Sequence, residues 1–124
     1  MTRIDKELTL RLNRNTELPC ECEDCQFFYK YNFSSNKQGE MFFACNGINP
    51  VQCNELWGIN LEDGIKRYLG FYYVAITDDD VDGYLISEEW TEINCIDYVI
   101  RYRLETLRNG KLAMGVEFDF YNIA

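Results

Sequence analysis

The sequence predicts an α+β fold, with short helices packed on an antiparallel meander that ends in a C-terminal β-hairpin. Three observations lead to this prediction. The chain has 124 residues and is 47% hydrophobic, so it can bury one core and form a single domain over residues 1–124. Gly47 and Pro50 close a helical stretch, since glycine ends helices in the left-handed conformation and proline prevents their continuation. After Glu55, segments such as 97–108 alternate apolar and polar residues, which is typical of strands.

The first element is predicted at residues 7–13, whose sequence ELTLRLN alternates apolar and polar positions. A period of two predicts a strand with one buried face. That face would be formed by Leu8, Leu10 and Leu12. Residues 24–32 are predicted to form a short helix, with Asp24 as its N-cap because a carboxylate accepts the first backbone N–H groups.

A second helix is predicted over residues 36–46, with Ser34 or Ser35 as its cap. Gly39 weakens this prediction, because glycine in a helix interior costs about 1 kcal/mol relative to alanine. The side chains expected to face the core are Phe42, Phe43 and Cys45.

The remainder of the chain is predicted to be mostly β. Leu56–Ile59 and Phe71–Thr77 are rich in aromatic and branched residues, which favour strands. Tyr84–Ile86 is a third candidate strand. Turns are expected at residues 62–64 and 82–83, where acidic residues precede glycine.

Residues 97–108 and 111–121 are predicted to form a hairpin. A two-residue turn at Asn109 would place the apolar set of one strand opposite charged residues of the other, so we predict a longer connection with a bulge at Gly110. The resulting register pairs Leu104 with Met114, Tyr102 with Val116, Ile100 with Phe118, Tyr98 with Phe120 and Arg101 with Glu117.

Charge and composition exclude several classes of function. The chain has 21 acidic against 12 basic residues, a formal net charge of -9, which disfavours binding to nucleic acid or to an anionic membrane. It contains no histidine, which removes the usual nucleophilic triads and proton shuttles, so we predict no enzyme and no catalytic residues. Residues 1–12 lack the apolar core of a signal peptide, and the longest apolar run is too short to span a bilayer. We therefore expect a cytoplasmic protein with reduced thiols.

The cysteines form a cluster, C-x-C-x-x-C, made of Cys20, Cys22 and Cys25. Such a cluster supplies part of a tetrahedral zinc site, but the second C-x-x-C pair of the usual framework is missing. The alternative is that these cysteines are small buried apolar residues. No cofactor is predicted, and zinc remains an alternative.

Residues 78–89 match the ligand spacing of an EF-hand calcium loop. Asp78, Asp80 and Asp82 occupy the first three ligand positions of such a loop. Gly83 occupies the position of the sharp turn, and Glu89 that of the bidentate ligand. Two features count against calcium, because Ile86 occupies a ligand position and Phe71–Thr77 before the loop is strand-like. A short exit helix would contain Trp90, Ile93 and Ile96.

Negative charge is concentrated between Tyr68 and Ile100, where the chain has no lysine or arginine. Most acidic segments of this kind simply form a solvent-exposed face. The functional interpretation is that this segment is a docking surface for a basic protein. Aromatic residues within it are suitable interface anchors. The predicted partner-binding residues are Asp78, Asp79, Asp80, Asp82, Glu88, Glu89 and Glu92, with Tyr84 and Trp90 as anchors.

Several short motifs together resemble an uncharacterised family of small bacterial proteins. They are the 20–25 cysteine cluster with Phe27, Phe42-Phe43 leading to Pro50, Glu55-Leu56-Trp57, Gly70-Phe71-Tyr72 and the closing residues 117–123. The acidic stretch 78–82 departs from the pattern. The resemblance implies a shared strand–helix–meander fold and no known catalytic residues.

Small acidic single-domain proteins of this kind also resemble, as a class, the immunity proteins that neutralise bacterial toxins. The predicted function is therefore an immunity protein that occludes the cleft of a basic toxin domain such as a nuclease. The alternative is a metal-binding protein that uses the acidic loop for calcium or the cysteines for zinc.

Overall fold

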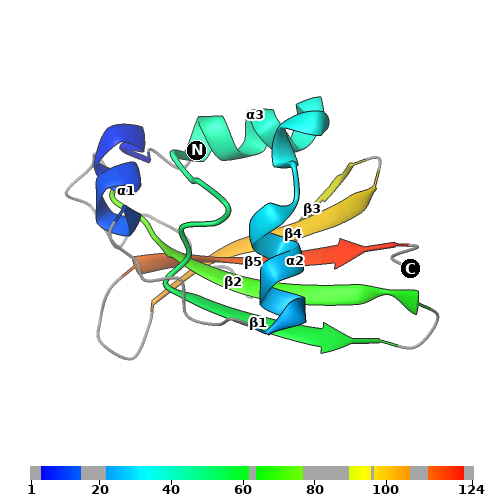
Figure 1. Ribbon diagram of the computed structural model, residues 1–124. Coiled ribbons are helices and arrows are strands. Elements are labelled where there is room, and N and C mark those ends of the chain that lie inside the picture. The colour runs from blue at the N-terminus through cyan, green and yellow to red at the C-terminus, as the bar shows by residue number, and fades with distance from the viewer. Residues whose placement is uncertain are drawn as a thin grey trace.

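A computed structural model describes residues 4–14, 22–61, 64–76, 90–95, 97–106 and 112–121. These residues form a five-stranded antiparallel sheet in the order β1-β2-β5-β4-β3, with α2 and α3 on one face and α1 beside one end of β2 (Figure 1). The elements are α1 Lys6–Asn13, α2 Glu23–Lys30, the 3-10 turn η1 Phe33–Ser35, α3 Lys37–Asn46, β1 Glu55–Asn60, β2 Lys66–Tyr73, β3 Thr91–Asn94, β4 Tyr98–Thr106 and β5 Leu112–Phe120.

The predicted α+β class is confirmed, and so is the register of the C-terminal hairpin. In β4 and β5 the structure pairs Leu104 with Met114, Tyr102 with Val116, Ile100 with Phe118, Tyr98 with Phe120 and Arg101 with Glu117. The connection between these strands, including Gly110, lies outside the described residues. The β3–β4–β5 meander joins the β1–β2 hairpin through β5 and β2, so residues far apart in the chain become neighbours in the middle of the sheet.

The predicted strand at residues 7–13 is wrong, because this segment is helix α1. Asp5 caps the helix, and its carboxylate accepts the backbone N–H of Leu8 at 3.0 Å. The three leucines are exposed, whereas Thr9 and Asn13, four residues apart, form the buried face. The alternation of leucines therefore did not mark a buried strand face.

Both central helices are present, but other residues cap them. Cys22 rather than Asp24 is the N-cap of α2, and Asn36 caps α3 in place of Ser34 or Ser35, which belong to η1. The amide side chain of Asn36 is buried and accepts N–H groups from two residues, Gln38 and Gly39. Gly47 closes α3 with φ 66°, as predicted. Phe42 and Phe43 are buried as expected, but Cys45 is exposed and does not face the core.

The strand predictions are confirmed in part. The predicted strand at Leu56–Ile59 corresponds to β1, and Gly64 has a left-handed φ of 74°, as the predicted turn requires. β2 begins at Lys66, five residues before the predicted start at Phe71. The candidate exit helix after the acidic loop is wrong, since Trp90 leads directly into strand β3. Tyr84–Ile86 lies outside the described residues.

The core between helices and sheet is largely aromatic. Phe28 of α2 lies within 5.0–5.2 Å of the ring centroids of Phe33, Tyr68 and Phe118, drawn from η1, β2 and β5. Aromatic pairs in such tilted and edge-on arrangements add about 0.5–1.5 kcal/mol each beyond the area they bury. This packing holds α2 and η1 against the middle of the sheet, and none of the described helices covers the opposite face.

Gly39→Ala is expected to destabilise the fold although alanine is the better helix former. A Cβ at Gly39 would overlap the hydroxyl oxygen of Tyr98, and Tyr98 is fully buried. We expect a loss of about 1–3 kcal/mol for this overpacking, which outweighs the gain of about 1 kcal/mol in helix propensity. Tyr98→Phe removes the overlapping oxygen, so the double variant should be more stable than the sum of the single effects predicts. Urea unfolding of the natural protein, the two single variants and the double variant measures the coupling between positions 39 and 98. Additive losses of stability would contradict the proposed clash.

Candidate functional site

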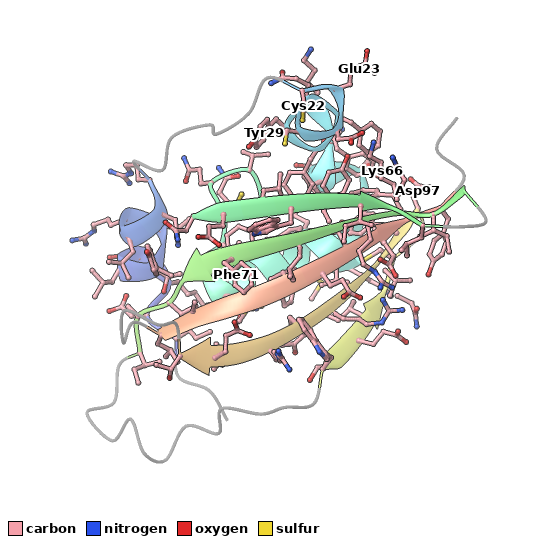
Figure 2. The ribbon with its side chains drawn as sticks, turned by 90° about the horizontal axis from the view of Figure 1, so that it is seen from below. Cys22, Glu23, Tyr29, Lys66, Phe71 and Asp97 are labelled. Atoms are coloured by element: carbon pink, nitrogen blue, oxygen red, sulfur yellow. The ribbon has the colours of Figure 1, made fainter. Side chains whose placement is uncertain are left out.

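The open face of the sheet, defined as the face opposite α2 and α3, carries both charged and aromatic side chains. Strand alternation and register place on it Glu55, Trp57 and Ile59 from β1, Arg67 and Phe71 from β2, Glu92 from β3, Arg101, Arg103 and Glu105 from β4, and Gly115, Glu117 and Asp119 from β5. Figure 2 shows the molecule from this side, with Phe71 in front of the strands. The described helices leave this face of the sheet free.

An arginine–carboxylate network, made of Arg67, Arg101, Asp119, Glu117 and Glu92, lies on the open face near the start of β2 and the end of β5. Arg67 donates to the two carboxylate oxygens of Asp119 at 2.7 and 2.9 Å. Arg101 donates to Asp119 at 2.7 Å, to Glu117 at 2.9 Å and to Glu92 at 3.0 Å. Two cations and three carboxylates therefore share charge-assisted hydrogen bonds across four strands.

Asp119 is the centre of this network, and its side chain is only 3% exposed. Burial alone would raise the pKa of its carboxyl, but the hydrogen bonds and charges of Arg67 and Arg101 together hold the pKa below its ordinary value. The same contacts raise the pKa of both arginines. Asp119, Arg67 and Arg101 are therefore charged at neutral pH, and the two arginines are held in place by carboxylates of the protein itself.

An aromatic cluster lies beside the network, around Gly115. A Cβ on Gly115 would lie 3.5 Å from the Phe71 ring, 3.7 Å from the Trp90 ring and 3.4 Å from a carboxylate oxygen of Glu105. The guanidinium of Arg103 stacks on Trp90, 4.5 Å from the ring centroid, and donates to Glu105 at 3.2 Å. These are ordinary van der Waals distances, so the two rings and the Glu105 carboxylate surround position 115 of β5 without excluding a small side chain there.

The edge of the sheet adds two exposed apolar side chains to the open face. Trp57 and Ile59 of β1 are 60% and 55% exposed. Large apolar groups left in water on one strand are a feature of interaction surfaces when they adjoin further aromatic and charged residues. Together with Phe71 and Trp90 they make the open face the best candidate binding surface among the described residues.

Of the nine predicted partner-binding residues, the structure describes Trp90 and Glu92, and it places both on the open face. Glu92 is part of the arginine–carboxylate network and Trp90 is stacked by Arg103, so both are held in defined positions. Asp78, Asp79, Asp80, Asp82, Tyr84, Glu88 and Glu89 lie outside the described residues. Their role stays a prediction.

The sequence analysis missed Arg67, Asp119 and Gly115 as members of the site. A signal was present in β5, where small or acidic residues alternate with buried apolar ones from Ala113 to Phe120. That alternation indicates that one face of β5 is apolar and that the other carries small and acidic side chains. It does not reveal which cations of other strands lie opposite.

The metal predictions are not decided by the described residues. Within them no group of three or more cysteine, aspartate or glutamate side chains is arranged to hold a metal ion. Cys22 and Cys25 are described, but Cys20 and nearly all of the calcium-like loop lie outside the described ranges. Both the zinc and the calcium alternatives therefore stay predictions.

Comparisons with known proteins returned no match: no family model, no curated protein and no solved structure resembles this chain significantly. The resemblance to small bacterial proteins noted from the sequence thus stays a prediction. Among the described helices none is long and apolar enough to cross a bilayer.

Proposed function

We propose that this protein is an acidic binding protein, specifically an immunity protein that blocks a basic toxin domain such as a nuclease. The observation that carries the proposal is the charge of the open face. Its three arginines, Arg67, Arg101 and Arg103, are all paired with carboxylates of the same face. Among the described residues that face also carries five carboxylates, so negative charges exceed positive ones by two (five minus three): Glu55, Glu92, Glu105, Glu117 and Asp119.

The adjoining sequence increases this excess. Residues 78–89 contain six carboxylates and no lysine or arginine, and they directly precede Trp90 in the chain. A nuclease binds the phosphates of its substrate, so its cleft is basic. An acidic surface with aromatic anchors is complementary to such a cleft, and it accelerates encounter through long-range attraction.

The first test is genetic and biochemical. An immunity protein is expected to be encoded immediately downstream of the toxin it neutralises, and the purified toxin domain from that gene should lose its activity when this protein is added in equimolar amount. Absence of a toxin gene at that place, or full toxin activity in the presence of this protein, would refute the immunity function.

The second test locates the interface on the acidic segment. The triple variant Asp79→Lys, Asp80→Lys, Glu88→Lys is expected to slow association with the toxin domain about tenfold or more at low salt. The difference should shrink near physiological ionic strength, where charges are screened beyond about 8 Å. Surface plasmon resonance at two salt concentrations measures both rates.

The matched control changes the net charge by the same amount on the helical side. Its substitutions are Glu7→Lys, Glu23→Lys and Glu40→Lys, all at exposed positions of α1, α2 and α3. This control should slow association much less than the acidic-segment variant does. Equal slowing by both variants would mean that only net charge matters, and it would remove the segment from the interface.

A further inference from the structure

Cys22 and Cys25 form a pair at the first turn of α2. Cys22 is the N-cap, and the backbone N–H of Cys25 donates to its sulfur at 3.5 Å. A spacing of three residues places both side chains on the same side of a helix, with Cβ atoms typically about 5–6 Å apart. A disulfide needs Cβ atoms about 3.5–4.5 Å apart, so its formation here requires a local adjustment of the first turn. The Cys22 side chain is exposed, whereas that of Cys25 is buried. Figure 2 shows Cys22 and Glu23 on α2 at the periphery of the molecule.

The helical turn that carries the two cysteines is fixed to strand β2 through Asp24, which lies between them in the chain. The carboxylate of Asp24, between the two cysteines, forms an ion pair with Lys66 of β2. The hydroxyl of Tyr68, also on β2, donates to the Asp24 backbone carbonyl at 2.6 Å. These two contacts to the sheet hold the first turn of α2 in one geometry, so the cysteines do not have to find each other by diffusion of a loose segment.

The other described cysteines lack this arrangement. Burial raises the pKa of the Cys53 thiol to about 11, and burial also raises the pKa of Cys95, so both are protonated and poor nucleophiles at neutral pH. Cys45 is exposed like Cys22, but no cysteine lies three or four residues from it on α3. Cys45 is therefore the natural internal reference for Cys22.

From this geometry we propose that Cys22 and Cys25 are a redox-active dithiol that closes to a disulfide by exchange with a small-molecule disulfide such as oxidised glutathione. The exposed Cys22 thiolate, formed by loss of its proton to solvent, attacks one glutathione sulfur. The glutathione S–S bond breaks, a mixed disulfide forms on Cys22, and the first glutathione thiolate leaves. Cys25, deprotonated in turn, then attacks the Cys22 sulfur and displaces the second glutathione thiolate. The protein dithiol loses two electrons in total, and one glutathione disulfide is reduced to two thiols.

The test uses the full-length reduced protein with oxidised glutathione in the presence of EDTA, so that no bound metal masks the thiols. Quenched samples are digested and analysed by mass spectrometry. We expect an internal disulfide between Cys22 and Cys25 without retained glutathione, and a persistent glutathione adduct on Cys45. A lasting adduct on Cys22, or a Cys22 that reacts no faster than Cys45, would overturn the proposal.

Two variants separate attack from resolution. Cys25→Ser should trap glutathione on Cys22, because the resolving thiol is gone, whereas Cys22→Ser should leave the buried Cys25 largely unmodified. Cys20→Ser should form the same Cys22–Cys25 disulfide as the unmodified chain. If the Cys20→Ser protein forms no disulfide, or if the natural chain joins Cys20 to Cys22, the dithiol is a different pair and the proposal is wrong. Far-UV circular dichroism of each reduced variant verifies that α2 and the sheet are intact.

Discussion

Asp119→Asn is expected to lower the free energy of unfolding at pH 7 by about 2–4 kcal/mol. Breaking a buried ion pair from one side costs about 3–5 kcal/mol, and the loss is somewhat smaller here because Arg67 and Arg101 remain partly exposed. The substitution removes the charge that both arginines share, and it leaves these two cations on either side of β5 without the carboxylate between them. Urea unfolding at pH 7 measures the loss.

The pH dependence distinguishes this electrostatic effect from a packing defect. The arginines hold the pKa of Asp119 below the ordinary value of about 3.9. A carboxyl with a lowered pKa in the folded state contributes stability above that ordinary value and loses it as the pH falls through the folded pKa. The gap between the natural protein and Asp119→Asn should therefore be constant near neutral pH and close in strongly acidic solution.

Glu7→Gln is the control for this experiment. Glu7 pairs with Arg11 one turn along α1, and its side chain is 86% exposed, so its loss should cost less than about 0.5 kcal/mol. If the Asp119→Asn gap were the same at every pH, the network would not be the source of the stability.

Gly47→Ala is expected to cost about 3 kcal/mol or more, because two effects add at this position. Gly47 has φ 66°, a conformation that costs other L-residues about 1–2 kcal/mol. A Cβ there would also overlap the carbonyl oxygen of Lys6 and lie 2.6 Å from its Cα. Backbone at the start of α1 cannot rotate away as a flexible side chain would, so overpacking adds about 1–3 kcal/mol.

Gly64→Ala separates the two effects. Gly64 has a similar φ of 74°, but no atom lies within 4 Å of an added Cβ. This variant should lose only about 1–2 kcal/mol of stability, which is the conformational cost of the left-handed backbone. Thermal or urea unfolding of both variants gives the comparison. Equal losses would show that α1 moves away from Gly47 without cost.

The C-terminal hairpin could be predicted from the sequence down to its residue pairs. Its strands are adjacent in the chain, and in each of them large apolar residues alternate with residues that are mostly small or charged. A register shifted by one residue would place charges such as Arg101 in the core. Local pattern and the demand for one buried face therefore leave a single solution. The same reasoning applies to the end of α3, where Gly47 marks the C-cap.

Helix α1 could not be predicted in this way, because its buried face is polar. Asn13 donates to the carbonyl of Tyr73 at 2.9 Å and accepts the backbone N–H of the same residue at 2.9 Å. Thr9 accepts the N–H of Ala75 at 3.0 Å. These side chains satisfy backbone groups at the end of β2, some 60 residues later in the chain. In the sequence they are indistinguishable from residues that face water, so the exposed leucines were the more conspicuous pattern.

What the sequence by itself determined about this protein is the α+β class, two of the three described α-helices in outline, the hairpin register and the excess of acidic residues. Only the tertiary structure decided which charges meet. Arg67 and Asp119 are 52 residues apart and become partners because β2 pairs with β5, a choice of strand order that neither strand's own pattern encodes. Gly115 likewise becomes part of the site only because β2 and β4 place Phe71 and Arg103 on either side of it. Local periodicity specifies the faces of a strand, whereas its neighbours are selected by the packing of the whole sheet against one core.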